Sequence, residues 1–185
     1  MIIKEHIASY NRMKPYCREP MLMLGNQENR CGYDFGVKYT TLDPDEGDIS
    51  WDLNIEIPPE WAGFYGTVYN LGTLEHVWDV HRAHVNAARM VKVGGNYLHH
   101  GPAAGYENHG IHITDWRMLL KFFKMNGFKI LEYWFTLQDG AFCSPPVRNC
   151  RQNILLCFIA KKAVSVETFH CPQQIFKSGI KQAIF

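Results

Sequence analysis

The sequence predicts an α/β protein with a doubly wound, mostly parallel sheet and an antiparallel hairpin at one edge. Between residues 20 and 127, short apolar runs typical of strands buried on both faces alternate with amphipathic, helix-like stretches. The last two strand-like runs, residues 128–137 and 153–160, have no clear helix between them. Two strands joined in this way are expected to pair antiparallel, at the edge of the parallel part.

The first part of the chain is expected to supply a lead-in helix and three strands. Residues 1–14 have apolar positions near helical spacing, and Pro15 follows as a stop. The runs from Met21 to Leu24 and from Val37 to Leu42 are typical of buried strands, with room between them only for a short or partly irregular crossover. A third strand of modest length is predicted from Ile49 to Leu53.

The next part of the chain repeats the strand–helix order more clearly. Two strands and two helices are predicted in alternation: Phe64 to Leu71, His76 to Val91, Asn96 to His100 and Thr114 to Gly127. The pair Gly94-Gly95 is the predicted stop of the first helix. Thr114 is the predicted N-cap of the second helix, and Gly127 closes it.

A single domain, residues 1–163, is expected, followed by an appendage of residues 164–185. A chain of 185 residues can form one sizeable core and is too short for two ordinary domains. We expect the appendage to pack on the domain or across a homodimer interface, because exposed apolar area forfeits roughly 25 cal/mol per Å². Its apolar side chains predicted to be buried are Phe169, Ile175, Phe176 and Ile180.

Charge and cysteine content exclude several classes of function. Lys plus Arg number 19 against 18 for Asp plus Glu, so no general positive field is present to hold a phosphate backbone, and nucleic acid is a poor candidate for the substrate. No apolar run approaches the roughly 20 residues that span a bilayer, and the N-terminus lacks the apolar stretch of a secretory signal. With six cysteines and no Cys-x-x-Cys pair, we expect a cytoplasmic protein with free thiols.

The most specific pattern lies between Tyr65 and Gly95. A strand ends in a loop carrying Glu75-His76, a helix follows, and the turn Lys92-Val93-Gly94-Gly95 precedes the next strand. In this order the sequence resembles the class I S-adenosylmethionine-dependent methyltransferases over roughly residues 20–160. The resemblance implies a Rossmann-like methyltransferase fold and methyl transfer from S-adenosylmethionine to an oxygen or nitrogen of a small molecule.

The resemblance also implies where the cofactor would bind. Gly25, after the first strand, matches the close approach of backbone to the cofactor, and Asp43, after the second strand, matches the acceptor for its ribose hydroxyls. Asn26 could donate hydrogen bonds to the methionine end. The remaining contacts that the resemblance implies are Asp52 and Leu53 at the adenine edge and Asn70, Leu71 and Gly72 beneath the sulfonium.

Departures from the family pattern keep a second function open. The acidic residue expected two positions before the first glycine is Met23, and the family's three-glycine pattern is reduced to Gly25. A glycine also ends many core strands, and the dipeptide Asp43-Pro44 also opens a turn. The alternative is therefore a methyltransferase-like binding or assembly module that has lost its cofactor.

Histidines are concentrated after the fifth predicted strand, at positions 99, 100, 109 and 112. A neutral imidazole can take a proton from a hydroxyl or amine near pH 7, so we predict a general base among His109, His112 and His100. His109 ranks first because it flanks Gly110 at the expected loop apex. Two alternatives remain: the histidines only shape a pocket wall, or they bind zinc or iron. Because their spacing matches no standard ligand pattern, no metal is predicted.

Overall fold

In the computed structural model, residues 4–26, 34–147 and 150–172 are described, and they form one seven-stranded sheet. The strands lie in the order β2-β1-β3-β4-β7-β5-β6. Their bounds are β1 Met21–Leu24, β2 Tyr39–Leu42, β3 Tyr65–Leu71, β4 Val91–Ala104, β5 Phe128–Leu137, β6 Phe142–Cys143 and β7 Ile154–Lys162. The α-helices are α1 Lys4–Met13, α3 Val80–Met90 and α4 Trp116–Met125, and single 3₁₀ turns occupy Lys14–Tyr16, Pro59–Trp61 and Leu74–His76.

The sheet has a parallel half and an antiparallel half, which confirms the predicted fold class. Strands β2, β1, β3 and β4 are parallel neighbours. Strand β7 runs antiparallel between β4 and β5, and the short β6 pairs with β5 at the edge. Strands β1 and β3 are buried along their whole length, as expected of central strands covered on both faces.

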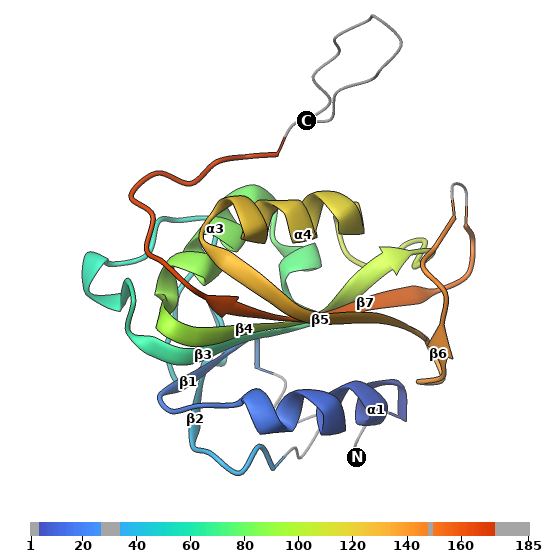
Figure 1. The fold of residues 1–185 in the computed structure, drawn as a ribbon, viewed down its shortest axis with the longest axis horizontal. Coiled ribbons are helices and arrows are strands. Elements are labelled where there is room, and N and C mark those ends of the chain that lie inside the picture. Colours follow the sequence, from blue (N-terminus) through green and yellow to red (C-terminus); the bar gives the residue numbers. More distant parts are fainter. Residues whose placement is uncertain (1–3, 27–33, 148–149, 173–185) are drawn as a thin grey trace, which may run out of the picture.

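Helices cover both faces of the sheet (Figure 1): α3 and α4 lie on one face and α1 on the other. The larger core cluster lies under α3 and α4, where Ala83, Ala87 and Ala88 allow α3 to approach the strands closely. The smaller cluster lies on the α1 side and includes Met13 and Met23. No helix in the described part of the chain has the length and apolarity needed to cross a bilayer.

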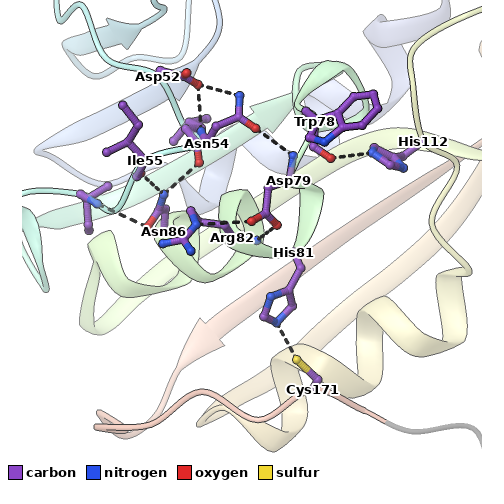
Figure 2. Close-up of polar contacts among 12 residues, drawn as sticks. Asp52, Asn54, Ile55, Trp78, Asp79, His81, Arg82, Asn86, His112 and Cys171 are labelled. Atoms are coloured by element: carbon purple, nitrogen blue, oxygen red, sulfur yellow. Dashed lines mark hydrogen bonds and ion pairs between the residues drawn. The ribbon is translucent and has the colours of Figure 1, made fainter. Parts of the chain in front are cut away.

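The prediction of a third strand from Ile49 to Leu53 is wrong. Ile49 makes one isolated parallel bridge to Leu42, and residues 50–58 form neither helix nor strand. The amide of Asn86 on α3 instead holds the segment, because its Nδ2 donates to the carbonyls of Leu53 and Ile55. Its Oδ1 accepts from the backbone N–H of Ile57. These contacts satisfy the backbone without a neighbouring strand (Figure 2).

Three predicted helix ends are also wrong. Helix α3 begins after Asp79, whose carboxylate accepts from the Arg82 N–H, and residues 74–76 form a separate 3₁₀ turn. The pair Gly94-Gly95 lies inside β4, which starts at Val91 directly after α3. The N-cap of α4 is Asp115, not Thr114, because the Asp115 carboxylate accepts from the N–H groups of residues 117 and 118.

The described part of the predicted appendage, residues 164–172, packs on the domain. Phe169 stacks on Phe122 of α4 at a ring-centroid distance of 6.2 Å and packs against the larger core cluster. The backbone of His170 exchanges two hydrogen bonds with the Asn126 amide. The predicted burial of Ile175, Phe176 and Ile180 concerns residues outside the described part of the chain.

Candidate functional site

A cleft of about 790 Å³ opens at the carboxyl ends of the parallel strands, where a doubly wound sheet places its ligands. Loops that follow β1, β2, β3 and β4 line it, because strands running in the same direction end at the same edge. The structure brings seven of the predicted site residues to this cleft: Gly25, Asn26, Asp43, Leu71, Gly72, His100 and His109.

Gly25 occupies a position that only glycine fits. Its φ is +79°, and a Cβ there would lie 2.4 Å from the Thr73 Oγ1. The Thr73 hydroxyl donates to the carbonyl of Leu24, 2.7 Å away, so the loop after β3 is fastened to the end of β1. The absence of a side chain at Gly25 therefore allows Thr73 to lie close to the end of β1. This contact between the two loops forms part of the floor of the cleft.

Asp43 presents an ionised carboxylate at the end of β2. Burial alone would raise the pKa of Asp43, but backbone N–H groups of Asp45, Glu46 and Asn26 donate to the carboxylate and hold the pKa below its usual value. The predicted turn and the predicted ligand acceptor are compatible, because a carboxylate oxygen can accept more than one hydrogen bond. The side chain of Asn26 donates to the Glu46 carbonyl at 2.8 Å, which fastens the two loops together.

The described lining of the cleft is acidic. It contains neither Lys nor Arg and five acidic side chains: Asp43, Asp45, Glu46, Glu75 and Glu107. Such a lining favours a ligand that carries positive charge.

Glu75 is a candidate functional residue that the sequence analysis does not predict. Only 7% of its surface is exposed, and burial raises the pKa of Glu75 to about 7, with its own backbone N–H as the opposing contact. It lies in the 3₁₀ turn after β3, and its side chain faces the cleft. The signal in the sequence is the Glu75-His76 pair, whose resemblance to a family motif does not by itself indicate a buried acid.

The loop after β4 is held against Glu75 through backbone contacts. The N–H groups of Ile111 and His112 donate to the Glu75 carbonyl at 2.7 and 3.0 Å. A Cβ on Gly110 would lie 3.0 Å from that carbonyl oxygen. These contacts set the position of His109, the residue before Gly110.

Glu75, His76 and His109 form a cluster at one end of the cleft, hereafter the Glu-His-His cluster. Each side chain offers one ligand atom, and the three atoms lie within 4.8 Å of one another. The imidazoles of His76 and His109 meet edge to face at 5.0 Å between centroids. Partial burial, and then the neighbouring His109, lower the pKa of His76.

Four predicted site residues lie outside the cleft lining. Asp52 accepts hydrogen bonds from Asn54, and the Nε2 of His112 lies 2.8 Å from the Trp78 carbonyl (Figure 2). The other two are internal: Leu53 is in the larger core cluster, and Asn70 is fully buried. His112 as the base stays a prediction, on a ring whose Nε2 contacts a backbone carbonyl and which lies outside this cleft.

Asn70 instead organises the turn after β3. Its Oδ1 accepts from the N–H groups of Thr73 and Leu74, both at 3.1 Å, and its Nδ2 contacts the Nδ1 of His99. His99 is buried, and burial holds its pKa well below the usual value, so it stays neutral inside the protein. His100, the next residue of β4, lies on the opposite face of the strand and lines the cleft.

No profile of a known protein family and no curated protein matches the sequence. Solved structures match its fold. One is 1,6-didemethyltoxoflavin-N1-methyltransferase from Burkholderia thailandensis, with bound 1,6-didemethyltoxoflavin and S-adenosylhomocysteine: TM-score 0.62, 11% identity, covering 87% of this chain and 79% of that one. A second is an S-adenosylmethionine-dependent methyltransferase from Thermotoga maritima: TM-score 0.57, 12% identity, covering 85% and 89%.

The chain has the fold of the S-adenosylmethionine-dependent methyltransferases. A third solved structure of this fold is the [4+2]-cyclase SpnF, with a TM-score of 0.61 and 11% identity, covering 84% of this chain and 80% of that one. Its description names a cyclase rather than a methyltransferase. The likeness shows the fold alone, and the function has to be argued from the residues of the cleft.

Proposed function

We propose that this protein transfers a methyl group from S-adenosylmethionine to an oxygen or nitrogen of a small molecule. The observation that carries the proposal is the acidic cleft at the carboxyl ends of the parallel strands, with the ionised Asp43 at the end of β2. Two hydroxyls of a ribose can donate to such a carboxylate, as ribose hydroxyls do in related sites. The volume is within the roughly 300–1,000 Å³ of small-molecule sites.

The lining of the cleft fits this cofactor in charge as well as in size. S-adenosylmethionine would supply an electrophilic methyl group on a positively charged sulfur. The acidic side chains around the cleft, Asp43 foremost, stabilise positive charge, and no Lys or Arg among the described lining residues opposes it. Leu71 and Gly72, at the end of β3, give this part of the cleft an apolar floor without a bulky side chain.

The contribution of the chain to the reaction would be alignment and proton removal. Rigid strand ends hold the acceptor and the methyl donor in one cleft, which replaces a bimolecular encounter by an oriented one. The proton released by the acceptor has nearby acceptors in the Glu-His-His cluster, which lines the same cleft as Asp43. His109 is the member that the sequence already indicated as a base.

A non-catalytic binding module is the second candidate. It is favoured by Thr73, which occupies the space beside Gly25, and by the commitment of the Asn26 side chain to Glu46. Both contacts use groups that a cofactor would otherwise contact.

Calorimetric titration with S-adenosylhomocysteine separates the two candidates. We expect one site per chain, weakened by about 1 to 3 kcal/mol in Asp43→Ala, because hydrogen bonds to a charged acceptor are lost. Asp52→Ala is the matched control and should bind like the wild type, since Asp52 contacts Asn54 outside the cleft lining. Absence of binding to the folded wild type at millimolar ligand would favour the non-catalytic module.

A further inference from the structure

We propose that Glu75, His76 and His109 bind a divalent transition-metal ion of the zinc type, with coordination positions left open toward the cleft. The open positions would accept an oxygen or nitrogen of the methyl acceptor, and this last assignment rests on the proposed function. With the ion bound, His109 would act as a ligand instead of a base; the ion would lower the pKa of the bound acceptor group, and the proton would leave to water. The metal site itself does not. It stands on the positions of three side chains, on the burial of Glu75 and on the way the loop after β4 is attached.

The chemistry of the three side chains matches a known class of metal site. Two imidazole nitrogens and one carboxylate oxygen bind zinc in catalytic sites, where a fourth position is kept for water or substrate. The same set with several open positions binds iron(II). The hard-oxygen sites preferred by magnesium and calcium have carboxylates and carbonyls instead, so the two imidazoles favour zinc over magnesium.

The distances allow the cluster to close around an ion. The three ligand atoms lie within 4.8 Å of one another. In a tetrahedral zinc site the ligand atoms stand about 3.4 Å apart, because each lies about 2.1 Å from the metal. Side-chain rotations that move each atom by about an ångström are sufficient. His76 and His109 are exposed and can make them without disturbing the core.

Glu75 is a buried carboxyl group without a countercharge. Only 7% of its surface is exposed, and no Lys or Arg of the described residues forms an ion pair with it. A buried carboxylate is costly unless it is paired or coordinates a metal. The opening beside it leads into the acidic cleft, where a cation would be attracted and where the two imidazoles are placed to share it.

The loop that carries His109 has an unusual backbone. Gly105, Tyr106, Asn108 and Gly110 all have left-handed φ angles, from +51° to +73°. For Tyr106 in particular this conformation is unfavourable, and such positions persist where surrounding contacts enforce them. At Tyr106 these contacts are the hydrogen bonds from its N–H to the Asn153 Oδ1 and from the His109 N–H to its carbonyl. After Gly110, residues 111 and 112 donate to the Glu75 carbonyl, so the loop holds His109 beside Glu75.

The test is a titration of metal-free protein with zinc alone, without cofactor or acceptor. We expect one zinc ion per chain in the wild type, and an affinity at least tenfold lower in Glu75→Gln and in His109→Ala. His112→Ala is the matched control on the same loop and should keep the wild-type affinity. The variant His81→Ala, Cys171→Ser removes a surface pair whose Nε2 and Sγ lie 2.6 Å apart and should also keep it.

Cobalt absorption and circular dichroism test the metal site without any measurement of enzyme activity. A cobalt-loaded wild type should show visible absorption bands that Glu75→Gln and His109→Ala change, while circular dichroism verifies that both variants are folded. Zinc affinity unchanged in these two variants, or no zinc binding by the wild type, would overturn the proposal. Zinc binding together with absent S-adenosylhomocysteine binding would support the metal site and reject only the proposed function.

Discussion

Replacement of Gly110 by alanine should weaken zinc binding at one end of the cleft and leave S-adenosylhomocysteine binding at the other end nearly unchanged. The φ of Gly110 is +73°, and the new Cβ would lie 3.0 Å from the Glu75 carbonyl oxygen and 3.1 Å from its Cγ. The left-handed conformation costs about 1 to 2 kcal/mol for a residue with a Cβ, and relief of the contact requires the loop to move away from Glu75. We therefore expect a local cost of about 1 to 3 kcal/mol.

Gly63→Ala supplies the control for the backbone effect. Its φ is +70°, nearly the same, but a Cβ there would meet no atom within 4 Å. The difference between the two variants therefore measures the contact with Glu75 rather than the conformation. Gly63 also lies outside the lining of the cleft that contains Glu75.

Calorimetry on the two variants gives the decisive comparison. Gly110→Ala should weaken zinc binding at least fivefold, because His109 moves with the loop, and should leave S-adenosylhomocysteine affinity within about twofold of the wild type. Gly63→Ala should change neither. If Gly110→Ala weakened the nucleoside ligand as much as zinc, or left zinc unaffected, the loop would not position His109 as we infer.

Three further substitutions test the architecture that holds the site, each by urea unfolding. Lys162→Met should lower the free energy of unfolding by about 1 to 3 kcal/mol, because the buried Nζ donates to carbonyls at the end of α3 at 2.7 and 3.0 Å. The control Lys161→Met changes an exposed residue and should lower it by less than about 0.5 kcal/mol. Asn70→Ala should cost about 2 to 4 kcal/mol through two lost backbone partners and a cavity, and a neutral result would show that the turn after β3 does not depend on its amide. Asp79→Ala removes the N-cap of α3 and should cost about 1 kcal/mol; an unchanged midpoint would contradict the cap.

Most strands of the sheet were predictable, because each is a short continuous apolar segment that can be recognised in the sequence without knowledge of its partners. Strand β1 and strand β5 have the predicted bounds. The end of α3 was not predictable in the same way. Lys162, 71 residues further along the chain than Val91, donates a hydrogen bond to the Val91 carbonyl just after the helix, and no local pattern shows such a contact.

The site was partly predictable for a topological reason. Gly25, Asp43 and Gly72 follow parallel neighbouring strands, so the fold alone carries them to one edge of the sheet. The preference for His109 over His112 rests in the sequence only on the neighbouring Gly110. The different surroundings of the two rings could not be predicted, because they depend on the fold of the loop: His109 lines the cleft, and His112 contacts the Trp78 carbonyl.

A crystal structure of the wild type grown with saturating S-adenosylhomocysteine tests the central proposal most directly. We predict density in the cleft between the ends of β1, β2 and β3, with both ribose hydroxyls within hydrogen-bonding distance of the Asp43 carboxylate and the sulfur toward the Glu-His-His cluster. Density for the ligand at another place, or a cleft without ligand density at a saturating concentration, would contradict the assignment of this cleft to methyl transfer.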